Sequence, residues 1–330
     1  MNQNNGLSTR PVGKIRIYGC GGGGVNIGKE YLDQGHSGDI ANIEACFIDT
    51  SDANLEDRLI DKTWLFDDLD GSGAVRQTNV AAIQKAIPDI IRKFPAADVN
   101  IVIFTLAGGT GSVAGPLLLQ QLLADGHMAV AIVIGAKHSG RNAENTLATV
   151  KTLDAIRHVT GKPVVMHLGI NSTNAPTDDG VDREAHLMIT SLAMLCSRRN
   201  HRLDTADLRS LFDFTKSTSA PAQMCRLHVT DNTEAFNKVM KTGPLAAAYL
   251  LRQSTDPVPD LFVPYSTYGT MPAIAQASGS LFFGIESGSM VELHKLVADL
   301  QKEVETQKRA ATQATNFVDA PPAGGSVLVF

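Results

Sequence analysis

The sequence predicts an α/β fold built around a parallel sheet. Short apolar segments typical of buried strands alternate along the chain with segments of helical period. Two glycine-rich turns each follow directly on one of the expected strands. Because parallel strands are joined by helical crossovers and are covered on both faces, this alternation favours a sheet packed between two layers of helices.

Length and composition are those of a globular protein with a sizeable core. The 330 residues suffice for two domains, or for one large domain split by a long internal element. Hydrophobic residues make up 43% and charged residues 19%, and no apolar run approaches the ~18 residues of a membrane span. The polar stretch 1–11 lacks the apolar core of a signal peptide, so we expect a soluble, cytoplasmic protein.

Charge and cysteine usage exclude further classes. A net charge of −5 without a basic tract disfavours direct binding to duplex DNA. The cysteines are widely spaced and form no CxxC pair, which predicts reduced, mostly buried thiols rather than a zinc site or disulfides. They are Cys20, Cys46, Cys196 and Cys225.

The most informative stretch is 101–112, where an apolar strand runs into a glycine turn that opens a helix. Its turn reads Ala107-Gly108-Gly109-Thr110-Gly111-Ser112. Successive glycines let backbone N–H groups surround an anion at a helix N-terminus, and Thr110 and Ser112 add hydroxyl donors. A glycine turn can also be simple punctuation between elements, but a second such turn upstream favours a phosphate-binding site.

That second turn, Gly19 to Gly24, follows a strand expected over 14–18 and precedes a helix expected from Val25 to about Gln34. Its glycines satisfy GxGxxG, a weak sign of dinucleotide binding. Asp49 or Asp52, after the next strand at 44–48, lies where a ribose-binding carboxylate would be. The amide of Asn26 is suited either to reading a base or sugar edge or to capping the helix.

Further elements follow from periodicity and from turn residues. We expect strands over 128–134, 163–168, 224–229 and 281–285, and helices over 79–94, up to 124 after the second turn, over 142–158, 181–196 and 290–314. The 181–196 segment is apolar all round, so we expect a buried central helix that joins two halves.

Two other loops carry candidate functional groups. The loop containing Gly71-Ser72-Gly73-Ala74 either approaches a terminal phosphate or is a plain connection. Asp204 and Asp207, three apart after the central helix, share one face of a helical turn. They could orient a water or a cation, or be a helix N-cap and its first turn.

These motifs resemble those of the tubulin/FtsZ family over most of the chain. The 107–112 turn is similar to the family's GGGTGTG loop, with alanine first and Val113 at the last glycine. The 19–26 loop resembles the FtsZ loop that ends in a guanine-contacting asparagine. Residues 202–207 resemble the NxDxxD loop, with Arg202 in place of the asparagine.

Within the family, the resemblance is closest to the phage-encoded tubulins of the PhuZ group. It is carried by Lys151-Thr152-Leu153-Asp154-Ala155-Ile156, by 202–204 and by the Asp49-Thr50-Ser51-Asp52 loop. It implies a GTPase that polymerises head to tail and forms a spindle positioning phage DNA in an infected bacterium. The implied partners are the chain itself and, indirectly, a phage capsid or DNA compartment. GTP or GDP and Mg²⁺ are the implied ligands.

The expected nucleotide-binding residues come from both turns and from the resemblance. They are Gly21, Gly22, Gly23, Gly24, Asn26, Asp49, Gly73, Ala74, Gly108, Gly109, Thr110, Gly111, Ser112, Arg141, Asn171 and Asp182. The resemblance assigns guanine recognition to Asn26, Asn171 and Asp182, and catalysis to Asp204 and Asp207. A helix over 181–196 spans ~24 Å away from the phosphates, so we expect both acids to act on the next subunit's nucleotide.

The alternatives are a plasmid-partitioning filament of the TubZ type, a filament that binds nucleotide without hydrolysing it, and an NAD-dependent oxidoreductase. The expected divisions are an arm (1–11), a GTP-binding domain (12–180), the central helix and catalytic loop (181–208), a smaller α/β domain (209–289), a long helix (290–315) and a tail (316–330). The tail ends in Val327-Leu328-Val329-Phe330, an apolar tip suited to docking on a partner.

Overall fold

The computed structural model describes residues 12–35, 40–53, 55–66, 69, 71–73, 75–136, 140–171, 179–272 and 279–312. The expected N-terminal arm, the tail and Ala74 lie outside the described residues.

The elements alternate as expected. The strands are β1 (Lys14–Cys20), β2 (Asn42–Asp49), β3 (Thr63–Leu65), β4 (Val99–Thr105), β5 (Met128–Ala136), β6 (Val164–Asn171), β7 (Met224–Thr230), β8 (Pro244–Leu251), β9 (Tyr265–Thr270) and β10 (Leu281–Glu286). The helices are α1 (Gly21–Gln34), α2 (Val80–Lys93), α3 (Gly111–Ala124), α4 (Gly140–Thr160), α5 (Asp179–Leu195), α6 (Thr205–Phe212), α7 (Thr233–Val239) and α8 (Met290–Thr312), with 3-10 turns η1 (Asp57–Lys62) and η2 (Phe214–Lys216).

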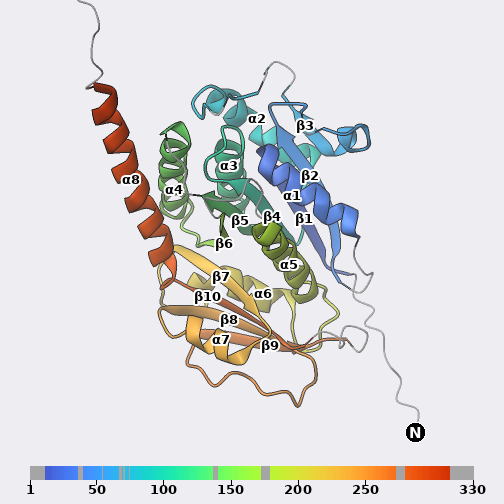
Figure 1. Cartoon of the computed structure of the whole chain (residues 1–330). Coiled ribbons are helices and arrows are strands. Elements are labelled where there is room, and N and C mark those ends of the chain that lie inside the picture. Colours follow the sequence, from blue (N-terminus) through green and yellow to red (C-terminus); the bar gives the residue numbers. More distant parts are fainter. Residues whose placement is uncertain are drawn as a thin grey trace, which may run out of the picture.

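The strands form one sheet in the order β3-β2-β1-β4-β5-β6-β7-β10-β8-β9 (Figure 1). From β3 to β7 every neighbouring pair is parallel. Strand β10 runs antiparallel to both β7 and β8, and β8 and β9 are parallel. The predicted α/β fold with a mostly parallel sheet is therefore confirmed.

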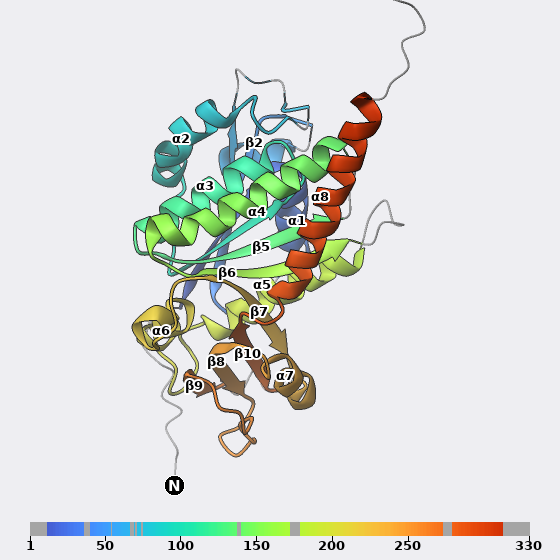
Figure 2. The same ribbon diagram turned by 90° about the vertical axis from the view of Figure 1, so that its left-hand side faces the viewer.

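Helices cover both faces of the parallel part of the sheet. Alternate residues of β1 separate into two cores, with Ile15 and Ile17 packing toward α1 and α5, and Tyr18 toward α2, α3 and α4. Figures 1 and 2 show these two helical layers, with α8 lying against α4. The cysteines are all buried and free, as expected.

Two helices differ from expectation. Helix α1 begins at Gly21, not Val25, so the glycines are its first turn rather than a preceding loop. Helix α5 is not buried all round, because Arg183 and Glu184 are exposed and Leu187 is 65% exposed. Helix α5 has more apolar residues than positions on its buried face, and for this reason its composition wrongly predicted burial on every side.

The sheet continues across the expected boundary between the two halves. Strands β6 and β7 pair over only three residues, Val164–Met166 with Met224–Arg226. Backbone hydrogen bonds therefore cross the boundary expected between a GTP-binding domain and a smaller domain. The division into these two domains stays a prediction.

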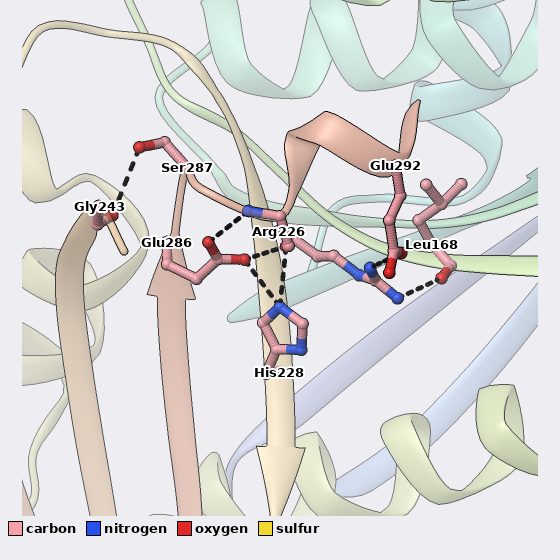
Figure 3. Close-up of polar contacts among 8 residues, drawn as sticks. Leu168, Arg226, His228, Gly243, Glu286, Ser287 and Glu292 are labelled. Atoms are coloured by element: carbon pink, nitrogen blue, oxygen red, sulfur yellow. Dashed lines mark hydrogen bonds and ion pairs between the residues drawn. The ribbon is translucent and has the colours of Figure 1, made fainter. Parts of the chain in front are cut away.

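A buried carboxylate ties the end of the sheet to the long C-terminal helix (Figure 3). Glu286 has no exposed surface, and its Oε1 lies 2.8 Å from His228 Nε2. Both the backbone N–H and the hydroxyl of Ser289 also bond to this carboxylate. Burial alone would raise the pKa of Glu286, but the hydrogen bonds from His228 and Ser289 outweigh it and hold the pKa below its ordinary value.

Arg226 makes a second connection beside the first. Its Nη1 donates to Glu292 on α8 at 2.5 Å, and its Nη2 donates to the Leu168 carbonyl of β6 at 3.1 Å. One side chain on β7 thus links the start of α8 to the parallel part of the sheet.

Burial, together with nearby Arg226 and His228, lowers the pKa of His167 to about 4, so this imidazole is neutral at pH 7.

Glu286→Gln should destabilise the protein at pH 7 by roughly 1–3 kcal/mol, because the hydrogen bonds then lose their charged acceptor. The folded-state pKa is depressed, so the carboxylate's contribution is present above pH ~4.5 and is lost as the pH falls through the folded value. The free energy of unfolding, measured with urea at a series of pH values, should therefore fall less steeply toward acid pH in this variant than in wild type. Glu292→Gln, at a largely exposed carboxylate, is the control. Parallel acid losses in wild type and Glu286→Gln would contradict the assignment.

Candidate functional site

The two glycine turns lie side by side at one end of the sheet. Strands β1 and β4 are parallel neighbours, and the strand order reverses between them. At such a reversal the connecting helices leave toward opposite faces, which opens a crevice beyond the carboxyl ends of the strands. Both turns begin at these ends, after Cys20 and Thr105.

The turns approach so closely that only glycine fits between them. A Cβ added to Gly21, which has φ +66°, would lie 2.6 Å from the Gly111 nitrogen, and one on Gly111 would lie 2.5 Å from the Cys20 oxygen. On Gly24 it would lie 2.2 Å from the Ile103 oxygen. The first N–H groups of α1 and α3, which lack partners within their helices, therefore converge on one place.

The remaining cradle glycines differ in exposure. Gly22, Gly23 and Gly108 are partly exposed, whereas Gly109 is buried. A Cβ at Gly23 or Gly108 would lie within 2.8 Å of the Thr105 side chain. This cradle is the kind of backbone concavity that binds phosphate.

The hydroxyl groups expected to bind phosphate are engaged within the protein. Thr110 Oγ1 lies 2.7 Å from Thr50 Oγ1. Ser112 is fully buried, and its hydroxyl donates to the Gly109 carbonyl at 3.4 Å. In this structure both side chains brace the turn.

Asp49 and Thr50 join this cradle to the next loop. The carboxylate of Asp49, at the end of β2, accepts from the Thr50 N–H at 2.8 Å. The Thr50 carbonyl accepts from the Gly71 N–H at 2.7 Å. Arg141 Nη1 donates to the Gly73 carbonyl at 3.2 Å. The glycine loop is thus tied on both sides rather than a free connection.

Three residues that support the turns were not identified from the sequence. Arg76 donates to the Ser112 carbonyl at 3.3 Å and to a hydroxyl on α4. Asn145 donates to the Ala107 carbonyl at 2.9 Å, and Thr149 to the Leu106 carbonyl at 3.0 Å. The i, i+4 spacing of Asn145 and Thr149 on one face of a helix could be seen in the sequence. The carbonyls that these two residues contact, however, lie about 40 residues away along the chain.

The predicted base-reading residues lie toward this same end of the sheet. Helices α1 and α5 run side by side in the same direction, since His186 contacts the Ile27 carbonyl and Thr190 contacts Tyr31. Asp182, in the first turn of α5, and Asn26, in the second turn of α1, are therefore near one another, and both are partly exposed.

Asn171 completes this group at the end of β6. Its Oδ1 is buried and has no hydrogen-bond partner among the described residues. A buried amide oxygen without a donor is uncommon and is well matched to a ligand N–H. This unpaired acceptor and the glycine cradle both fit a nucleotide.

Asp204 and Asp207 form a capping box. Asp204, the N-cap of α6, accepts from the Asp207 N–H at 3.0 Å, and Asp207 Oδ2 accepts from the Asp204 N–H at 3.0 Å. The N-cap interpretation is confirmed, whereas catalysis stays a prediction. Arg202 before them has φ +66°, and its guanidinium donates to the Tyr268 hydroxyl at 2.8 Å.

The structure does not bring this capping box to the cradle of the same chain. The Gly13 N–H donates to the Ser197 carbonyl and the Ala41 N–H to the Ala193 carbonyl, both at 3.0 Å. The end of α5 therefore lies at the amino ends of β1 and β2, opposite the glycine turns. The seven residues of β1 separate the two ends by roughly 20 Å.

Across the part of the chain that the structure describes, no helix is long and apolar enough to cross a membrane. The same residues contain no group of three or more His, Cys, Asp or Glu side chains that could hold a metal ion.

Comparison with known proteins agrees with the fold. Residues 14–163 match the model of the Tubulin/FtsZ family, GTPase domain. A phage tubulin-like protein of Pseudomonas phage PhiPA3 is 31% identical over 244 residues, 73% of this chain and 74% of that protein. This confirms the resemblance to phage tubulins.

Solved structures agree over nearly the whole chain. A protofilament of TubZ from bacteriophage PhiKZ has a TM-score of 0.83 at 25% identity. The phage tubulin PhuZ with GDP has a TM-score of 0.82 at 27% identity. Each comparison covers 94% of this chain and 96% of the other. The chain belongs to the tubulin/FtsZ family and carries its GTPase domain, and its relatives include phage tubulin-like proteins.

Proposed function

We propose that the protein is a GTPase that polymerises head to tail into dynamic filaments and hydrolyses GTP only where two subunits meet. The observation that carries this proposal is the separation of the two halves of the site. The phosphate cradle lies at the carboxyl ends of the strands, and the capping box of Asp204 and Asp207 lies beyond their amino ends.

In this proposal the backbone N–H groups of Gly21–Gly24 and of Gly108–Ser112 hold the phosphates, with Gly73 near the terminal one. Asp49 lies beside the cradle, where it accepts from the Thr50 N–H. Arg141 is connected to the site by its hydrogen bond to the Gly73 carbonyl. Phosphoryl transfer needs mainly positioning and neutralisation of charge, which convergent N–H groups provide. Mg²⁺ would be held chiefly by the phosphates and water and would add charge neutralisation.

Guanine would be recognised by Asn26, Asn171 and Asp182. A carboxylate at Asp182 can accept from both N1–H and the 2-amino group of guanine, a donor pair that adenine lacks. The unpaired Oδ1 of Asn171 supports this assignment, because a bound base would supply the missing donor.

The filament follows from where the acids lie. A subunit stacked head to tail on its neighbour offers its Asp204 and Asp207 to the neighbour's cradle, and such a heterologous contact extends without closing. The carboxylates would orient the attacking water. Relatives solved as a TubZ protofilament from PhiKZ and as a PhuZ201 filament support assembly of this kind.

The cellular role we propose is a phage spindle that positions phage DNA in the infected bacterium. Relatives from Pseudomonas phages favour this role over a plasmid-partitioning filament of the TubZ type. An oxidoreductase explains only the first glycine turn. A filament without hydrolysis would leave the placement of both acids without a catalytic purpose.

Capping and catalysis by Asp204 can be separated, because asparagine caps a helix as well as aspartate does. Asp204→Asn should retain wild-type thermal stability, bind GTP and form filaments, but lose most phosphate release. Asp204→Ala should lose turnover and in addition ~1 kcal/mol of stability. Phosphate release, light scattering and thermal unfolding of both variants measure this. Wild-type turnover in Asp204→Asn would contradict a catalytic role.

Asp182→Ala should reduce the preference for GTP over ATP by about tenfold or more, because a paired acceptor contributes ~1.5–3 kcal/mol. Competition of GTP and ATP against a fluorescent nucleotide measures it. Glu184→Ala, an exposed acid two residues further along α5, is the control. The guanine assignment fails if the wild-type protein binds ATP as tightly as GTP.

A further inference from the structure

The long helix α8 reaches the edge of the nucleotide site. Its apolar stripe, which includes Leu296, Leu300 and Val304, is buried in the same core as α4. Figures 1 and 2 both show the two helices side by side, and they pack against each other. Gln307 lies three residues beyond Val304, which places it on the same face of α8.

Gln307 caps the first turn of α4. Its Oε1 accepts from the Gly140 N–H at 2.8 Å, although the two residues are 167 positions apart. Its Nε2 donates to Glu303 Oε1 at 2.7 Å, which fixes the amide with its oxygen toward Gly140. The first N–H groups of a helix have no partner within the helix, so this bond stabilises the start of α4.

The residue after Gly140 is Arg141, whose guanidinium donates to the Gly73 carbonyl. The Gly71 N–H in the same loop donates to the Thr50 carbonyl, and the Thr50 hydroxyl pairs with that of Thr110 in the cradle. Four hydrogen bonds, joined by the short chain segments Gly140–Arg141 and Gly71–Gly73, therefore connect α8 with the phosphate cradle.

We propose that Gln307 is a positioning residue of the nucleotide site: by capping α4 it holds Arg141 against Gly73, so that α8 helps to retain the nucleotide. This inference rests on the proposed function, because it needs a guanine nucleotide in the cradle. A partner that takes Gln307 away from Gly140 would then weaken nucleotide binding, and the nucleotide would weaken the binding of that partner by the same factor.

Release of a fluorescent GDP analogue from dilute, unassembled protein tests this. Gln307→Ala should release the analogue about three- to tenfold faster than wild type, as expected for loss of one net hydrogen bond. Gln301→Ala is the matched control, since Gln301 is an exposed glutamine on the same helix. The double variant E303Q/Q307E keeps an acceptor for Gly140 and a paired neighbour, and should restore slow release.

A double-mutant cycle distinguishes positioning from general stability. Arg141→Ala should also speed release, and Arg141→Ala with Gln307→Ala together should be no faster than Arg141→Ala alone, because Gln307 acts through Arg141. Additive effects, or a lower melting temperature with unchanged release in Gln307→Ala, would overturn the inference.

The proposed function fails in a different way. If wild-type protein retains no GDP analogue, the nucleotide assignment and the inference both fall. If wild type retains it and Gln307→Ala releases it at the same rate, only the role of Gln307 is wrong.

Discussion

The backbone of Gly21 packs directly against the backbone of Gly111, with no room for a side chain between them. This contact requires that β1 and β4 be neighbours and that both strands end at nearly the same level. It also requires that α1 begin directly after β1, and that residues 106–110 bring the chain from the end of β4 to the start of α3 beside it. Sheet order, strand length and helix starts all meet that requirement. The surrounding polar groups, Thr50, Arg76 and Asn145, then bond to the turns from other elements and hold the cradle in shape.

The same sheet that brings the turns together keeps the acids away from them. Helix α5 starts beside the cradle and ends at the amino ends of the strands, so its length carries Asp204 across the molecule. Capping of α6 orders both carboxylates before any partner arrives, because each is fixed by a backbone N–H. In the proposed mechanism, this order at each end would favour hydrolysis that depends on contact between subunits.

Much of this architecture could be predicted from the sequence because strands and helices have strong periodicities. The start of α1 could not, since Gly21 to Gly24 have no side chains to reveal a helical period. The exposure of Leu187 could not be predicted either, because an apolar residue alone does not indicate which face of a helix is covered. Thr149 and Gln307 were missed for another reason: each bonds to backbone far along the chain, and no local pattern names such a partner.

The most direct test of shared catalysis is phosphate release per subunit, measured at saturating GTP over a wide range of protein concentration. If the next subunit's Asp204 and Asp207 complete each nucleotide site, phosphate release per subunit should be close to zero in dilute protein. It should rise steeply at the protein concentration where assembly begins. An equal rate per subunit in dilute and concentrated protein would contradict catalysis between subunits.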